Sequence, residues 1–287
     1  MASEDHAVSG VNAIRTLAVY FVTLLKRTSM MRFIVLLVFS AASCIDLHAQ
    51  ASKQEYYELR IYHVKHHGQE AAVEVFLKDA LLPTLHRAGI KNIGVFKPVE
   101  TDSTYGKLIY LLVPYGSLDM FVNIPDLIAV DKKYNEDGLM YHDALYANPP
   151  YDRMEKIVLR NFKGAPKLMP PSLTGPRSER IYELRSYESA TEKIYRNKVK
   201  MFVEGDEVGL FGRLGFNAVF YADVTAGSRM PNLMYMTAFA NQISHDEHWK
   251  AFVDDPQWKK LSAMPEYQNN VSKNTKYLLR PTQYSDY

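Results

Sequence analysis

The sequence has a single cysteine, little excess of one charge sign and no common cofactor-binding motif. Its single cysteine, Cys44, lies before the predicted folded domains, so no disulfide framework is expected within those domains. The 34 basic and 32 acidic residues form no long charged block, which argues against nucleic acid as a partner. The motifs G-x-S-x-G, G-x-G-x-x-G, H-E-x-x-H and the P-loop are missing, which argues against several common enzyme classes but not against enzymes in general. We expect neither a metal nor a cofactor.

One heptad occurs twice and organises the rest of the chain. Residues 56–62 read Y-Y-E-L-R-I-Y and residues 181–187 read I-Y-E-L-R-S-Y, so Y-E-L-R-x-Y recurs with Tyr182 in the place of Tyr57, 125 residues later. A shared heptad of this kind indicates duplication of a domain. The 287 residues have an ordinary globular composition, and two domains of about 100–125 residues fit that length.

Hydrophobic periodicity and turn residues predict the same order in both copies: strand, helix, strand, strand, helix, strand. The spacing S-x-x-E at Ser189 and Ser244 predicts capping boxes for two helices of the second copy. Pro125 is expected to break the second helix of the first copy. The predicted strands are 56–64, 92–99, 107–113, 155–162, 180–187, 217–224, 233–239 and 276–280. The predicted helices are 69–87, 117–122, 126–135, 189–213, 244–255 and 257–263.

Glycine and proline gather between the two copies, and we interpret that stretch as a linker. The repeat then sets the domain boundaries on either side of it. The predicted organisation is an N-terminal extension with a signal peptide at 1–51, a first domain at 52–163, the linker at 164–177 and a second domain at 178–287.

Residues 32–50 follow the order of a secretory signal peptide, with Arg32 before the apolar run 33–42 and small residues after it. The run is too short to span a bilayer comfortably, and cleavage near Ala49 or Ala51 is expected. The prediction is an extracytoplasmic protein, periplasmic or secreted, that meets a membrane only through its signal peptide. A lipoprotein anchored through Cys44 is the alternative.

Residues 1–29 fit that pattern poorly, because Glu4 and Asp5 stand where a signal peptide carries basic residues. We expect the natural start at Met30 or Met31, preceded by an extended or misassigned segment. The alternative is one long, unusual anchor that includes an earlier apolar run.

Three motifs together resemble the NIPSNAP family over most of residues 55–287. They are the two heptads, W-x-x-F-x-x-D-P-x-W at 249–258 and L-L-R-P-T-x-Y-S at 278–285. The resemblance implies an α+β fold: two tandem ferredoxin-like βαββαβ domains that pair their antiparallel sheets into a dimeric α/β-barrel-like pseudo-dimer, with the helices outside. The wider superfamily includes cofactor-independent monooxygenases, haem enzymes, isomerases and members without assigned activity, so the resemblance implies no single reaction.

The best candidate ligand-binding residues are the polar side chains of the two heptads. Side chains alternate faces along a strand, so the leucines, Leu59 and Leu184, are expected under the helices and the polar row in the barrel interior. An arginine there could bind an anion, a glutamate could act as a base and a tyrosine could donate a hydrogen bond. The alternative, which we weight more heavily, is a purely structural ion network. The six candidates are Glu58, Arg60, Tyr62, Glu183, Arg185 and Tyr187.

Histidine and tryptophan clusters carry weaker signals, and a structural role is favoured for each. A solvated loop is favoured over a metal site at the first histidine cluster, helix capping over a metal at the second, and core packing over a ligand cage for the aromatic residues. The groups are His63, His66 and His67; His245 and His248; and Trp249, Phe252 and Trp258.

Two functions fit these patterns. The first is a small-molecule-binding protein, with oxygenase- or isomerase-like activity as an option, that uses the barrel interior. The alternative is a non-catalytic interaction module, and a homo-oligomer fits either. A closed pocket with polar and aromatic walls favours the first, whereas a plugged interior with an apolar surface patch favours the second. We expect the first copy to form the pocket mouth, because its loop around residues 148–150 could serve as a lid, and the second copy to act as scaffold.

Overall fold

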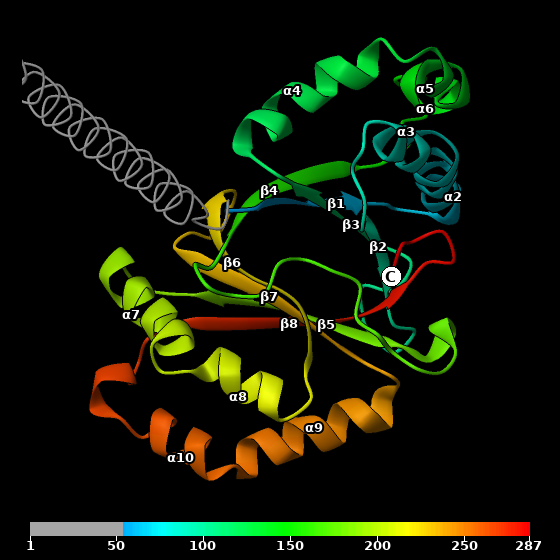
Figure 1. Cartoon of the computed structure of the whole chain (residues 1–287). Coiled ribbons are helices and arrows are strands. Elements are labelled where there is room, and N and C mark those ends of the chain that lie inside the picture. The colour runs from blue at the N-terminus through cyan, green and yellow to red at the C-terminus, as the bar shows by residue number, and fades with distance from the viewer. Residues whose placement is uncertain (1–53) are drawn as a thin grey trace, which may run out of the picture. The chain divides into compact units, whose positions relative to one another are not determined.

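Eight antiparallel strands close into a barrel in residues 54–287, the part of the chain that the computed structural model describes (Figure 1). The strand order around the barrel is β1-β3-β2-β8-β5-β7-β6-β4. The strands are β1 (Tyr56–His63), β2 (Gly94–Pro98), β3 (Leu108–Tyr115), β4 (Arg153–Asn161), β5 (Ile181–Glu188), β6 (Asn217–Ala226), β7 (Asn232–Phe239) and β8 (Lys273–Pro281).

Helices cover the barrel on two opposite sides, those of each half of the chain on their own side (Figure 1). The helices of the first half are α2 (His67–Val75), the π-helical η1 (Phe76–Leu81), α3 (Leu82–Arg87), α4 (Leu118–Ala129), α5 (Lys132–Asp137) and α6 (Leu139–His142). Those of the second half are η2 (Arg177–Glu179), α7 (Glu192–Val203), α8 (Glu207–Arg213), α9 (Gln242–Asp254), α10 (Pro256–Ser262) and η3 (Pro265–Tyr267). No helix among these is long and apolar enough to cross a membrane.

Both halves contribute to closing the barrel. The first half forms the neighbouring strands β4-β1-β3-β2, and the second half forms β8-β5-β7-β6 in the corresponding order. Strand β2 pairs with β8 at Phe96 and Pro281, and β4 pairs with β6 at Arg160 and Asp223. Because both junctions join one half to the other, neither half closes a barrel by itself.

Large side chains from both halves fill the barrel interior. Tyr57 and Leu59 of β1 meet Tyr182 and Leu184 of β5 in one buried cluster, and all four are fully buried. Separate clusters lie between the sheet and the helices, where Tyr62 belongs to the layer of the first half. Tyr187 belongs to the layer of the second half. The prediction that Leu59 and Leu184 lie under the helices is therefore wrong, since the apolar face of each heptad packs inward.

Helix α4 runs through Pro125, although we predicted that this proline would break it. Proline has no N–H, so the carbonyl of Phe121 loses its usual helical donor there. Pro125 is exposed, and water can hydrogen-bond that carbonyl in place of the missing donor. The helix therefore keeps its course at a local cost.

Neither predicted capping box forms. The hydroxyl of Ser189 donates to the carbonyl of Asn270 at 2.7 Å, and α7 begins three residues later, at Glu192, with Thr191 as its cap. Helix α9 is capped by Asn241, whose side chain accepts from the N–H of Ser244 at 2.9 Å. In each case a nearby polar side chain captures the free N–H groups of the first turn.

The single helix predicted at 189–213 is also wrong, because the chain breaks between α7 and α8. Asp206 takes a left-handed conformation at φ 61° directly before α8. That conformation ends one helical axis and lets α8 start along another.

Candidate functional site

The two polar rows lie between the sheet and the helices, not in the barrel interior as predicted. Glu58 and Glu183 are each 1% exposed, and Tyr62 and Tyr187 belong to the two sheet–helix layers. The physical reason is the availability of hydrogen-bond donors. The barrel interior contains mostly apolar side chains, whereas the layer between the sheet and the helices contains donors for the carboxylates. The six residues are brought together as two separate groups of three, one on each side of the barrel.

The row of the first half forms a connected polar network. Nε of Arg60 donates to Oε1 of Glu58 at 2.7 Å, and Nη1 of Arg60 donates to the hydroxyl of Tyr62 at 3.0 Å. The hydroxyl of Tyr115, on β3, donates to Oε2 of Glu58 at 3.0 Å. Lys156 lies opposite Arg60 on β4, with its Nζ 3.9 Å from Oε1 of Glu58. One buried carboxylate is therefore shared by two cations.

These charges set the protonation states of the first row. Burial alone would raise the pKa of Glu58, but Arg60, Lys156 and the Tyr115 hydroxyl outweigh it and hold that pKa below its usual value. Burial lowers the pKa of Lys156, Arg60 lowers it further, and Glu58 only partly opposes them. The site thus holds an ionised carboxylate beside a lysine that loses its proton more readily than a solvated one.

A cavity of about 590 Å³ opens over this row, between the sheet and helices α3 to α6. Its volume lies in the range of about 300–1,000 Å³ that is typical of small-molecule sites. Its polar lining is Glu58, Arg60, Tyr115, Tyr134, Asn135, His142 and Lys156. Its apolar lining is Leu81, Leu85, Phe121, Val122, Ile124, Pro125, Ile128 and Ala129. The only carboxylate in that lining is Glu58, so the two basic residues outnumber it.

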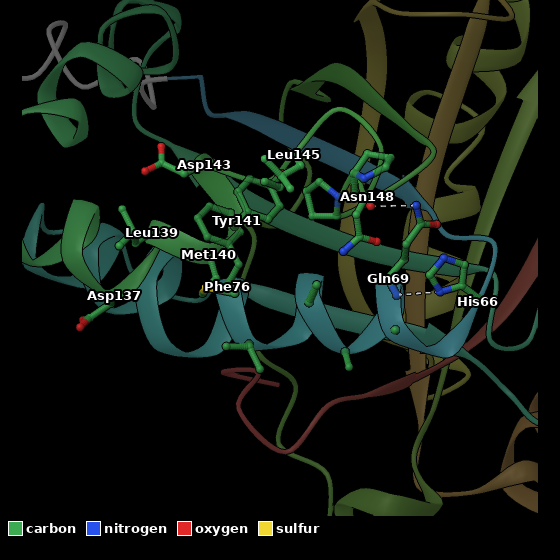
Figure 2. A pocket seen from close by; sticks show the side chains of 17 residues that line it. His66, Gln69, Phe76, Asp137, Leu139, Met140, Tyr141, Asp143, Leu145 and Asn148 are labelled. Atoms are coloured by element: carbon green, nitrogen blue, oxygen red, sulfur yellow. Dashed lines mark hydrogen bonds between the residues drawn. The ribbon is translucent and has the colours of Figure 1, made fainter.

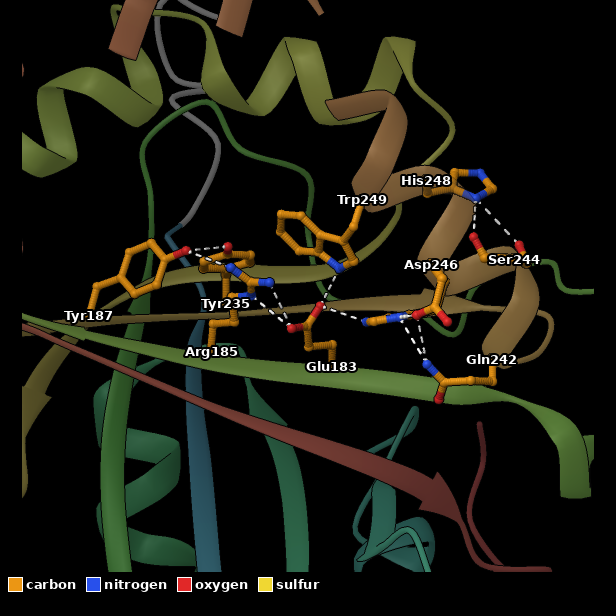
Figure 3. Close-up of polar contacts among 10 residues, drawn as sticks. Glu183, Arg185, Tyr187, Tyr235, Gln242, Ser244, Asp246, His248 and Trp249 are labelled. Atoms are coloured by element: carbon orange, nitrogen blue, oxygen red, sulfur yellow. Dashed lines mark hydrogen bonds and ion pairs between the residues drawn. The ribbon is translucent and has the colours of Figure 1, made fainter. Parts of the chain in front are cut away.

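The equivalent row of the second half is covered by a tryptophan (Figure 3). Nε of Arg185 donates to Oε1 of Glu183 at 2.8 Å. The indole ring of Trp249 lies over the guanidinium of Arg185, and the distance from the guanidinium carbon to the ring centroid is 3.6 Å. The indole N–H of Trp249 donates to Oε2 of Glu183, which also meets Nε2 of His245 at 3.2 Å. Nη1 of Arg185 donates to the hydroxyl of Tyr187 at 3.1 Å.

The histidine and tryptophan expectations are met only in part. His66 caps α2, accepting from the N–H of Gln69 at 3.3 Å, and Trp249 packs against the core of the second half as predicted. At the second histidine cluster we expected the neighbouring acids to cap the helix, but Asn241 caps it and the ring of His245 reaches the sheet and binds Glu183. Within residues 54–287, no group of three or more His, Cys, Asp or Glu side chains is placed to hold a metal ion.

A second hollow lies on the surface of the first half, between α2 and the segment 137–150 (Figure 2). Its volume is about 670 Å³, and the loop at 148–150 forms one wall. Met140 is 86% exposed and Leu145 is 75% exposed, so part of its rim is apolar surface in contact with water. The loop that we expected to act as a lid therefore borders this groove, and it is not part of the lining of the cavity over Arg60.

The fold belongs to a class of antiparallel α+β barrels that includes monooxygenase-like proteins. A candidate monooxygenase from Lactobacillus acidophilus superposes with a TM-score of 0.52 at 11% identity, covering 79% of this chain and 94% of that one. A candidate monooxygenase from Fusobacterium nucleatum gives a TM-score of 0.51 at 9% identity, covering 80% of this chain and 93% of that one. At such identities the likeness establishes the fold alone.

Residues 182–286 match the family model for NIPSNAP. This match lies in the second half of the chain and confirms, for those residues, the resemblance found in the sequence motifs. A NIPSNAP family protein from Agrobacterium tumefaciens aligns at 20% identity and a TM-score of 0.33, covering 37% of this chain and 96% of that one. No curated protein matches the chain by sequence.

Proposed function

We propose that this protein binds a small amphipathic organic anion in the cavity over Arg60. The observation that carries the proposal is the charge of the lining, in which Arg60 and Lys156 face the single carboxylate of Glu58. An anionic ligand near Arg60 and Lys156 would balance this excess of positive charge. The apolar side chains of α3 and α4 would cover the body of such a ligand.

The hydrogen bonds of Arg60 leave one of its nitrogens for a ligand. Nε and Nη1 are used by Glu58 and Tyr62, and among the described residues Nη2 has no hydrogen-bond acceptor. Nη2 of Arg185, by contrast, lies 2.8 Å from Glu183. A carboxylate or phenolate that reaches Nη2 of Arg60 would make a charge-assisted hydrogen bond.

We further propose that the chain consists of two tandem ferredoxin-like domains, 52–163 and 178–287, whose sheets pair as a pseudo-dimer. The matching element order and strand order of the two halves support this. In this arrangement the second half, with its row covered by Trp249, serves as scaffold for the first. Either half expressed alone should aggregate or pair with itself, because its inner sheet face is apolar. A soluble monomeric half would contradict the proposal.

Titration calorimetry with decanoate and 2-naphthoate tests the binding proposal. The full chain should bind either anion at one site, and Arg60→Met should weaken binding at least about tenfold, since a hydrogen bond to a charged group contributes about 1.5–3 kcal/mol. Lys156→Met should weaken it in the same direction. Arg185→Met is the matched control in the second half and should keep the affinity, with folding of each variant checked by circular dichroism.

Two results would contradict the proposal. One is that neither anion binds the wild-type protein. The other is that Arg185→Met weakens binding as much as Arg60→Met does. The oxygenase- or isomerase-like activity implied by the family resemblance stays a prediction, to be tested by oxygen consumption and product analysis once a ligand is in hand.

An interaction module remains the second candidate, because the barrel interior is filled and the groove beside α2 exposes apolar side chains. Met140, Leu145 and the fully exposed Tyr146 would form its contact surface. Light scattering of wild type and of Met140→Lys/Leu145→Lys tests the option of a homo-oligomer. An oligomer that dissociates in the variant would support it, and monomers in both would remove it.

A further inference from the structure

The two halves place different residues at the same point of their second long helix. Ser117 caps α4 and Asn241 caps α9. Pro125 is the eighth residue after the first cap, and Trp249 is the eighth after the second. The strands beneath also correspond, since Arg60 lies opposite Lys156 on β4 and Arg185 lies opposite Lys276 on β8. Pro125 is thus the counterpart of Trp249.

This exchange accounts for the cavity over Arg60, because the first half has no tryptophan at the place that Trp249 fills in the second half. The indole of Trp249 lies over Arg185 and donates its N–H to Glu183 (Figure 3). Proline has a short side chain and no N–H, so Pro125 can neither stack on Arg60 nor donate to Glu58 as Trp249 does in the second half. Pro125 instead lines the cavity that opens over Arg60 and Glu58.

The carboxylate of Glu183 has one more hydrogen-bond donor around it than the carboxylate of Glu58. Oε2 of Glu183 accepts from Trp249 and lies within hydrogen-bond distance of His245. Oε2 of Glu58 accepts from Tyr115, and no second side-chain donor to that atom occurs among the described residues. An ionised carboxylate oxygen can accept two hydrogen bonds. In the first half, Arg60 and Glu58 line the cavity at the place that corresponds to the indole. The side chain of Arg60 is 14% exposed, and its guanidinium carbon lies 5.9 Å from the ring centroid of Tyr62.

We propose that the cavity takes a planar aromatic ligand with a hydrogen-bond donor in the plane of its ring. The ring lies on the guanidinium of Arg60, as the indole of Trp249 lies on Arg185, and its O–H or N–H donates to Glu58. Phenols of fused ring systems, in their neutral form, supply both the planar ring and the O–H donor. The inference rests on the proposed function, because it names the ligand class of the same site.

Two matched pairs of probes test the planarity and the donor separately, by calorimetry on the full chain. Stacking on arginine contributes about 0.5–2 kcal/mol, so 2-naphthoate should bind about tenfold more tightly than decahydro-2-naphthoate, its saturated counterpart. 2-Naphthol should bind about tenfold more tightly than 2-methoxynaphthalene, which has no donor, and Glu58→Gln should narrow that second difference.

The substitution Pro125→Trp should close the cavity as Trp249 closes the other row, and it should abolish binding of 2-naphthol. Pro125→Ala is the control and should keep it. Equal affinities within each pair of probes, or full binding by a folded Pro125→Trp, would overturn the inference. If Pro125→Trp does not fold, the probe pairs on the wild type decide alone. If 2-naphthoate and decahydro-2-naphthoate bind equally and their binding still depends on Arg60, the proposed function stands but the planar ligand class does not. If no probe binds, both the proposed function and this inference are wrong.

Discussion

The ammonium group of Lys198 lies 3.0 Å from Oε2 of Glu207, and both side chains are almost completely buried in the second half of the chain. The same ammonium lies 4.6 Å from the ring centroid of Phe202. Burial raises the pKa of the Glu207 carboxyl, and the charge of Lys198 opposes that rise. This pair is far from solvent and touches no cavity described above, so its role is structural.

Breaking this pair should destabilise the protein strongly. Lys198→Met leaves a buried carboxyl without its cation, and the free energy of unfolding should fall by about 3 kcal/mol. The double variant Lys198→Met/Glu207→Leu should recover most of that loss, because no charge is then left behind. Urea unfolding measures both. Lys250→Met, which breaks an exposed pair with Asp254, should change stability by less than about 1 kcal/mol. A double variant as unstable as the single one would contradict this account.

His245 should make stability depend on pH. Burial alone would lower the pKa of His245, but its bonds to Glu183 and Asp246 outweigh burial and raise that pKa above 6.5. A raised folded pKa means that the protonated ring stabilises the fold fully below the unfolded pKa, and that this contribution is lost as pH rises through the folded pKa. The unfolding free energy of wild type should therefore exceed that of His245→Phe most at acidic pH, and the excess should shrink at alkaline pH.

Urea titrations from about pH 5.5 to about pH 9 measure that excess, a range chosen to bracket the histidine transition. His248→Phe, on the same helix, is the control and should leave the pH dependence in place. An excess that is constant over the range, or that grows with pH, would show that the contact between His245 and Glu183 does not carry the effect.

Pro125→Ala should stabilise the protein. A proline in a helix interior costs about 3 kcal/mol relative to alanine, and part of that cost should be regained, giving a gain of about 1–2 kcal/mol. Pro256 is the first residue of α10, where proline is well tolerated, so Pro256→Ala should bring no such gain. Thermal unfolding distinguishes the two. A loss of stability in Pro125→Ala would mean that the proline packs as a structural residue.

Export stays a prediction that falls on residues outside the described part of the chain. The basic, apolar and small segments of residues 32–51 predict cleavage, so the N-terminus of the exported protein should lie between Cys44 and Ser52. Sequencing of the mature N-terminus checks this. A mature protein that keeps residues 33–39 would refute the prediction, and fatty-acid labelling that depends on Cys44 would establish the lipoprotein alternative.

The heptad repeat carried most of the fold that could be predicted from sequence. Hydrophobic periodicity and turn residues correctly gave the element order of both halves, because they are local properties of the chain. The face of the polar row was predicted wrongly, because alternation tells which side chains share a face and not which layer receives them. Here that choice depends on Tyr115, His245 and Trp249, which supply donors from elsewhere in the chain.

The cavity itself depends on a comparison that single motifs do not reveal. Trp249 was interpreted as core packing and Pro125 as a helix break, and each interpretation is reasonable on local grounds. Their correspondence appears only when the caps Ser117 and Asn241 are aligned, and the expected cap was Ser244. With the correct N-cap, the sequence alone would have shown that Trp249 and Pro125 hold the same position in their helices.

A crystal structure of the full chain soaked with 2-naphthol tests the central claim most directly. The account predicts the ring on the guanidinium of Arg60, next to Pro125, with the hydroxyl donating to Glu58, and no naphthol at the row covered by Trp249. Naphthol bound instead in the groove at Met140, or absent from the cavity at saturating concentration, would contradict it.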